Sequence, residues 1–157
     1  MTKVLWTSRW LSVRRDGHSD EFFVAGDEVL LVALDQDDNV LLIEEPSPAF
    51  GSNLLFLPCG AVENGEPIIE AAQRELREET GYRANLLEVV GSIRPWPKYL
   101  RLTSHLVRAA GLSEDPLPPD ETYPIVVRRK SRQDVQAAIR SGEICDARII
   151  AALALCL

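Results

Sequence analysis

The sequence predicts an α+β fold in which a mixed β-sheet lies between helical layers. Two almost continuous apolar runs, 28–34 and 40–43, have the composition of strands that are buried on both faces. The run 67–81 is instead rich in Ala, Gln, Arg, Glu and Leu, which favour a helix. Strand-like and helix-like segments alternate along the chain, and no internal repeat, low-complexity tract or linker divides them. We therefore expect residues 1–157 to form a single domain.

The N-terminal region, 1–26, is predicted to form a hairpin ahead of a core over 27–157. Its strands are expected at Trp6–Val13 and Glu21–Val24, separated by turn-forming residues. The aromatic side chains of this hairpin are too dense for a free terminal arm. We expect them to pack across a homodimer interface, and packing against the chain's own sheet is the alternative. These side chains belong to Trp6, Trp10, Phe22 and Phe23.

The core elements follow from the positions of turn formers and apolar runs. Turn formers at 35–39 separate the two buried strands, and a loop is predicted over Pro46–Asn53. The later elements are expected to be strands over 54–57, 86–93, 100–107 and 125–128, a proline-rich connection over 111–122, and helices over 132–140 and 147–156.

The helix expected at 67–81 has recognisable ends and an apolar face. Pro67 suits a first helical position, and Gly81 supplies a left-handed stop. Ile69, Ala72 and Leu76 recur at helical spacing, which predicts the stripe that docks on the core.

Three carboxylates crowd the end of this helix, namely Glu75, Glu78 and Glu79. Like charges at this spacing cost a few tenths of a kcal/mol per pair, and a hard divalent cation such as Mg²⁺ would relieve that repulsion. Glu75 and Glu79 are separated by roughly 40° around the helix, so they are the first choice as direct ligands. Glu78 is expected to bridge or to lie just outside the direct ligands. Arg74 is four residues from both Glu70 and Glu78 and is expected to brace that edge.

Residues 60–82 as a whole resemble the Nudix box of the Nudix hydrolases. The match extends to every charged and glycine position, with Tyr82 standing where a smaller aliphatic residue is commoner. The resemblance implies an α/β/α sandwich with a mixed sheet, in which the box forms a loop-helix-loop motif. It also implies hydrolysis of a diphosphate bond with Mg²⁺ or Mn²⁺, and a homodimer. The matched positions are Gly60, Glu66, Arg74, Glu75, Leu76, Glu78, Glu79 and Gly81.

The resemblance also assigns roles to single residues of the box. It implies that the metal is held by the three helix carboxylates together with the main-chain oxygen of Cys59. Arg74 is implied to hold the glutamates in place, and Glu66 to order the loop or a metal-bound water. The metal-binding set is therefore expected to be Cys59, Glu75, Glu78 and Glu79, and the catalytic set Arg74, Glu75, Glu78, Glu79 and Glu121.

The general base is expected in the acidic loop 113–121, because similar ADP-ribose pyrophosphatases carry a catalytic glutamate in the corresponding late loop. Glu121 aligns best with that position. For any single member of the loop, the alternative is a solvated carboxylate without a catalytic role. His18 and His105 are isolated in the sequence, and neither is assigned to catalysis.

The segment 94–101 carries the expectation about substrate. Pro97 lies fifteen residues after Tyr82, as in ADP-ribose pyrophosphatases, and Tyr99 lies at seventeen, as in dinucleoside polyphosphate hydrolases. The combination, like the runs 46–60 and 141–147, resembles bacterial ADP-compound hydrolases. Glu44, Glu45 and Phe56 depart from that group. The mixed cations and aromatics of the segment are expected to stack a base and reach its phosphates, the alternative being a rigid proline loop. The predicted substrate-binding residues are Arg94, Trp96, Pro97, Lys98, Tyr99 and Arg101.

The predicted substrate is ADP-ribose or a related ADP compound. One alternative is hydrolysis of dinucleoside polyphosphates or nucleoside triphosphates. The other is a Nudix-like sensor that binds without cleaving, but such sensors tend to lose box carboxylates and this chain keeps them all.

Composition constrains the partners and the location. The net charge of −7 argues against a nucleic-acid-binding platform. The longest apolar run, 149–157, is too short to span a bilayer, so no membrane partner is expected. Three cysteines without paired spacing, in a chain that starts without a signal peptide, predict reduced thiols and a cytoplasmic enzyme.

Overall fold

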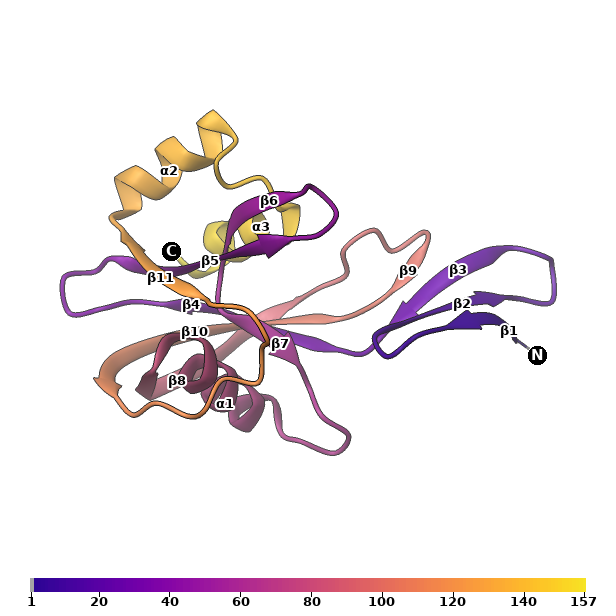
Figure 1. The fold of residues 1–157 in the computed structure, drawn as a ribbon, viewed down its shortest axis with the longest axis horizontal. Coiled ribbons are helices and arrows are strands. Elements are labelled where there is room, and N and C mark those ends of the chain that lie inside the picture. Colours follow the sequence, from indigo (N-terminus) through magenta and orange to yellow (C-terminus); the bar gives the residue numbers. More distant parts are fainter. Residues whose placement is uncertain (1) are drawn as a thin grey trace.

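The computed structural model describes residues 2–157, which fold into three β-sheets and three α-helices (Figure 1). Met1, with which the predicted N-terminal region begins, lies outside the described residues. The strands are β1 (Lys3–Thr7), β2 (Leu11–Arg15), β3 (Glu21–Ala25), β4 (Glu28–Ala33), β5 (Val40–Ser47), β6 (Ser52–Phe56), β7 (Cys59–Ala61), β8 (Tyr82–Ile93), β9 (Leu100–Arg101), β10 (Ser104–Glu114) and β11 (Val126–Lys130). The helices are α1 (Ile68–Thr80), α2 (Arg132–Ser141) and α3 (Ala147–Cys156).

The central sheet is mixed, as predicted. Its strand order is β7-β4-β10-β8, with β10 parallel to β4 and antiparallel to β8. Strands β11, β5 and β6 form a second, antiparallel sheet, and an isolated bridge between Leu34 and Val40 joins β4 to β5. The two apolar runs predicted as buried strands are β4 and the first half of β5, and both are buried.

Strand β4 supplies side chains to two separate cores. Because successive side chains of a strand point to opposite faces, Leu30 and Val32 enter the core beneath α2 and α3. Val29 and Leu31 enter the core beneath α1. Figure 1 shows α1 on one side of the sheets and the two C-terminal helices on the other. The predicted α/β/α layering is therefore confirmed.

Helix α1 ends as predicted but is rotated from the predicted stripe. Gly81 adopts a φ of 77°, a left-handed conformation in which its N–H reaches the Arg77 carbonyl. Ile69 is 38% exposed, so its predicted place in the core is wrong. Ala71 is buried instead, beside Ala72 and Leu76. The two alanines are small and allow the helix to approach the sheet, and Leu76 fills the core beside them.

The strand predicted over Trp6–Val13 is wrong, because a turn divides it into β1 and β2. The Ser8 hydroxyl accepts hydrogen bonds from the N–H groups of Trp10 at 3.3 Å and Leu11 at 3.1 Å. Strands β1, β2 and β3 then form an antiparallel sheet, which β9 extends by pairing parallel to β3. This N-terminal sheet projects away from the helical layers (Figure 1).

Two other predicted boundaries also shift. The loop predicted over Pro46–Asn53 is shorter, because β5 and β6 pair up to Ser47 and Ser52 and leave only a turn over 48–51. The strand predicted over 100–107 is divided between β9 and β10, and β10 extends into the predicted connection because β8 pairs with it up to Glu114. Within residues 2–157, no helix has the length and apolar character needed to cross a membrane.

Candidate active site

The backbone of β7 lies directly against the acidic face of α1. The Glu75 side chain is buried, and a Cβ atom built on Gly60 would lie 2.1 Å from its carboxyl carbon. Only a residue without a side chain permits this approach. The glycine thus lets the Glu75 carboxylate lie against the main chain of the box loop.

Glu79 is held against the same loop by the preceding residue. Its Oε2 accepts a hydrogen bond of 2.7 Å from the backbone N–H of Cys59. Burial raises the pKa of the Glu79 carboxyl well above its usual value, and the nearby carboxylates of Glu75, Glu45 and Glu121 raise it further. Glu75, which is buried, and Glu79, which is half-buried, therefore form a mutually repelling pair.

Arg74 joins the carboxylates of the box to one another. Its Nη1 donates to Glu75 at 2.6 Å and to Glu78 at 3.0 Å. Its Nε and Nη2 donate to Glu66 at 2.9 and 3.0 Å, and Nη2 also reaches the Ala61 carbonyl at 2.9 Å. Arg74 therefore contacts Glu78, as predicted. The contact expected with Glu70 is replaced by those to Glu66 and Ala61, because the side chain turns back towards the box loop.

Glu66 orders the loop in front of the helix. It accepts a hydrogen bond of 2.9 Å from the Glu63 N–H while it pairs with Arg74. The hydrogen bond from Arg74 lowers the pKa of the Glu66 carboxyl, so this group stays ionised at neutral pH. Glu66 therefore closes the loop through Glu63 and is itself held in place by Arg74 of α1.

The chemistry of these side chains fits a divalent cation. Burial raises the pKa of Glu75 to about 7, although the neighbouring Arg74 opposes the shift. Oxygen ligands and an excess of negative charge are what Mg²⁺ and Mn²⁺ require. Within residues 2–157, no three His, Cys, Asp or Glu side chains already converge as a metal cluster. In this structure the carboxylates of Glu75 and Glu78 are paired with the guanidinium of Arg74.

A cavity of about 710 Å³ opens over this end of α1. Its lining includes Glu75, Arg74, Gly60 and Cys59 from the box, together with Glu121 from the late loop. The structure therefore brings the predicted base to the same cavity as the box. Glu78 and Glu79 are not part of the lining; Glu78 accepts a hydrogen bond from Arg74, and Glu79 accepts one from the Cys59 backbone.

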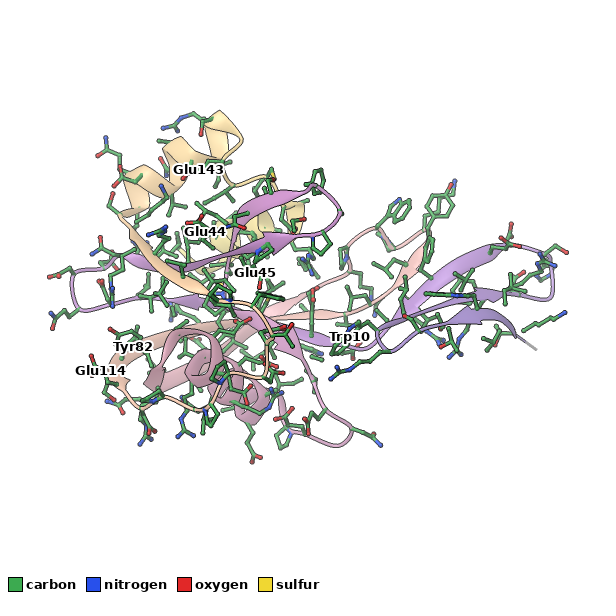
Figure 2. All side chains as sticks on the ribbon, in the orientation of Figure 1. Trp10, Glu44, Glu45, Tyr82, Glu114 and Glu143 are labelled. Carbon is green, nitrogen blue, oxygen red and sulfur yellow. The ribbon has the colours of Figure 1, made fainter. Side chains whose placement is uncertain are left out.

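The cavity also contains residues that the sequence argument missed. Arg9 and Trp10 line it from the N-terminal sheet, and the Arg9 guanidinium lies 4.3 Å from the centroid of the Trp10 ring. Figure 2 shows Trp10 at the end of that sheet nearest the core. Arg148 lines the floor and pairs with Glu28 at 2.9 Å. An arginine next to a tryptophan in the sequence could have indicated a binding site, but the turn at Ser8 that directs Arg9 and Trp10 to the cavity was not predicted.

The predicted substrate-binding loop lines an adjoining cavity and not the one that contains Glu75. This second cavity, of about 790 Å³, is lined by Arg94, Pro97, Lys98, Tyr99 and Arg101. The two cavities share the lining residues Ala25, Gly26, Asp27 and Leu102.

Trp96 lines neither of these two cavities, although its ring lies against another residue of the loop. Its backbone has a φ of 51°, and its ring lies 6.3 Å from that of Phe23 and 5.0 Å from that of Tyr99. It lines a third hollow, with Arg94 and Arg148, next to α3.

Comparison with known proteins assigns the family. The sequence model of the NUDIX domain family matches residues 24–153 of this chain. The chain is 30% identical over 126 residues to the ADP compounds hydrolase NudE of Escherichia coli strain K12, which covers 80% of this chain and 68% of that protein. It is 26% identical over 122 residues to the ADP-ribose pyrophosphatase of Bacillus subtilis strain 168, with 76% and 66% covered.

A crystal structure of an ADP compounds hydrolase matches with a TM-score of 0.83 and 25% identity, covering 99% of this chain and 89% of that one. The chain belongs to the NUDIX domain family, and the resemblance of residues 60–82 to the Nudix box is confirmed. It is a Nudix hydrolase, an enzyme that acts on diphosphate bonds.

Proposed function

We propose that this enzyme hydrolyses the diphosphate bond of an ADP-linked small molecule, ADP-ribose or a related compound, with Mg²⁺ or Mn²⁺. The observation that carries the proposal is the carboxylate pair of Glu75 and Glu79, held against the backbone of Gly60 and Cys59 beside a cavity large enough for a nucleotide. The matched relatives named as ADP compounds hydrolase and ADP-ribose pyrophosphatase support the substrate class.

Each box residue has a defined part in this proposal. Glu75, Glu78 and Glu79 would hold the cation, together with the main-chain oxygen of Cys59. When bound, the cation neutralises phosphate charge and lowers the pKa of water. Arg74 keeps Glu75 and Glu78 oriented through its hydrogen bonds of 2.6 and 3.0 Å. Glu121, at the rim of the same cavity, accepts the proton of the attacking water.

The two adjoining cavities suit the two halves of an ADP-linked substrate. Trp10 offers an aromatic face in the cavity that contains Glu75, and Tyr99 offers one in the next. Arg94, Lys98 and Arg101 form no ion pair with any residue of the 2–157 region, so their charges are available to phosphate. Pro97 and Trp96 shape the loop that presents them.

These three free cations also favour a second candidate, the hydrolysis of dinucleoside polyphosphates, whose additional phosphates would need them. Nucleoside triphosphates share that chemistry. A sensor without activity is disfavoured, because the chain keeps every carboxylate of the box.

We further infer a homodimer in the cytoplasm. Strand β1 is exposed along its whole length, with Trp6 54% exposed, which supports burial against a second copy. Cys59, Cys145 and Cys156 are free thiols, which supports a reducing compartment. The net charge of −7 disfavours a nucleic-acid partner.

A parallel assay tests the substrate. ADP-ribose, NADH, diadenosine polyphosphates and nucleoside triphosphates would be compared by kcat/KM with Mg²⁺, with Mn²⁺ and with a chelator. The proposal requires ADP-ribose or another ADP compound to rank first and the chelator to abolish turnover. Equal rates with the chelator would overturn the metal requirement, and a triphosphate in first place would overturn the substrate class.

A further inference from the structure

Tyr123 and Glu45 form a hydrogen-bonded pair beside the active site but outside the Nudix box. The Tyr123 hydroxyl donates to Glu45 Oε2 at 3.2 Å and so joins the end of the late loop to β5. Both side chains are half-buried, whereas Glu121 is exposed. Burial and the facing carboxylates of Glu45 and Glu121 raise the pKa of the tyrosine well above its usual value. The hydroxyl therefore keeps its proton and remains a donor at neutral pH.

The pair is one of two anchors of the loop that contains Glu121. Residues 115–125 contain neither helix nor strand. At the start of the loop, the Asp115 N–H donates to the Gly81 carbonyl at 2.9 Å, and Arg77 Nε donates to the Asp115 carbonyl at 2.9 Å. At its end, Tyr123 reaches β5 just before β11 begins its pairing with that strand. Glu121 lies between these anchors, at the cavity with Glu75.

Stability alone does not account for a glutamate at position 45. Burial raises the pKa of Glu45, and repulsion from Glu121 raises it further. Glu45 in turn raises the pKa of Glu79. A neutral acceptor would receive the Tyr123 hydrogen bond without these costs. A half-buried carboxylate placed close to other carboxylates lowers stability, and residues that lower stability in this way are expected at functional sites.

We propose that Tyr123 and Glu45 are positioning residues of the hydrolysis. Their hydrogen bond draws the end of the late loop towards β5, while the Glu45 charge keeps the Glu121 carboxylate turned towards the cavity. The inference rests on the proposed function, in which Glu121 accepts a proton. It extends that function to two residues that do not touch the substrate.

A double-mutant cycle tests the pair. Tyr123→Phe removes only the hydroxyl, whereas Glu45→Ala removes both the acceptor and the charge that faces Glu121. Each is expected to lower kcat for ADP-ribose by about 10- to 100-fold, with KM within a factor of about two, because a misplaced catalytic group costs turnover and not binding. The double variant should be no slower than the worse single variant. Glu45→Gln, which keeps an acceptor oxygen, should recover part of the loss.

The matched control is Tyr82→Phe. Tyr82 also loses a hydroxyl contact, the 2.6 Å hydrogen bond from Arg129, but it lies away from Glu45 (Figure 2). Its kcat should match that of the parent. A Tyr123→Phe variant as active as the parent, or single losses that multiply in the double variant, would overturn the inference.

A readout without substrate separates this inference from the proposed function. Cleavage after Glu121 by a glutamate-specific protease, followed by mass spectrometry, reports how firmly the loop is held. The Tyr123→Phe and Glu45→Ala variants should be cut several-fold faster at this bond than the parent and Tyr82→Phe. Equal cleavage would refute the anchor even if ADP-ribose is hydrolysed. Faster cleavage in a protein that does not hydrolyse ADP-ribose would retain the anchor and reject the substrate.

Discussion

The carboxylate of Glu75 occupies the space that a side chain at Gly60 would need. A Cβ at position 60 would lie 2.1 to 2.3 Å from the carboxyl carbon and both carboxylate oxygens of Glu75. The obstacle is the mobile end of a side chain and not backbone. A larger residue at 60 therefore moves the carboxylate without disturbing the sheet or the helix.

The first prediction follows for Gly60→Ala. We expect its free energy of unfolding to stay within about 1 kcal/mol of the parent, because only a side-chain end must shift. Hydrolysis should fall by about 100-fold, since the displaced carboxylate is a proposed metal ligand. Gly17→Ala is the control, because a Cβ there meets nothing within 4 Å. Steady-state kinetics beside chemical denaturation distinguish the two effects, and full activity in Gly60→Ala would contradict the assignment.

The second prediction concerns the carboxylates themselves. Glu79→Gln and Glu75→Gln keep the shape but remove a charge, so kcat should fall by at least about 100-fold. Glu70→Gln, on the exposed first turn of the same helix, should match the parent. Circular dichroism checks that all three variants fold. Unchanged turnover in Glu79→Gln would eliminate the metal-binding role.

The third prediction is a dependence of stability on pH in the absence of metal. Glu75 titrates near 4.5 when unfolded and near 7 when folded, so between these values the folded protein binds more protons. Raising the pH from about 5 to about 8 should therefore lower the free energy of unfolding, by about 3 kcal/mol from Glu75, and Glu79 acts in the same direction. Urea titrations across this range provide the measurement.

Two comparisons accompany the pH measurement. Glu75→Gln should flatten the decline, because the titrating group is gone. Saturating Mg²⁺ should offset the decline, since it binds only the ionised carboxylates. A metal-free stability that rises over the same range would show that burial does not govern these groups.

The fourth prediction separates binding from turnover. Trp10→Ala and Tyr99→Ala should raise KM more than they lower kcat, because stacking binds ground state and transition state alike; Trp96→Ala should raise KM through the shape of the loop. Arg94→Ala or Arg101→Ala should lose a contact to phosphate, on the order of 1.5–3 kcal/mol in kcat/KM. Arg83→Ala, an exposed arginine on β8, is the control. If only Trp10→Ala affects KM, the substrate lies wholly in the cavity that contains Glu75.

The fifth prediction is a dimer mass by light scattering at micromolar concentration. The interface should include β1, so Trp6→Arg should shift the mass towards the monomer, whereas Phe50→Arg should not. Both side chains are exposed, Phe50 by 75%, but Phe50 lies on the turn between β5 and β6. A monomer of the parent protein would count decisively against the interface.

The helix and its box were predictable from the sequence because their signals are local. The helix stop at Gly81, Arg74 and the carboxylates all lie within a few turns of one helix, so their spacing in the sequence determines their relative positions. The place of Trp10 in the cavity lining could not be predicted, because the direction of this residue depends on a turn closed by the Ser8 hydroxyl, which no apolar pattern records. Glu45 and Tyr123 are 78 residues apart, so their contact depends on the pairing of β5 with β11. The residues of β5 or of β11 alone do not indicate the register in which the two strands pair.

Strand β4 constrains how the chain can vary. Its side chains alternate between the two cores, so one half of them supports the box helix and the other supports the C-terminal helices. A deletion of one residue would exchange the two sets, and both helical layers would lose their partners at once. Changes of length in this enzyme must therefore fall in the connections between strands, where new substrate contacts can arise while the spacing between the layers is preserved.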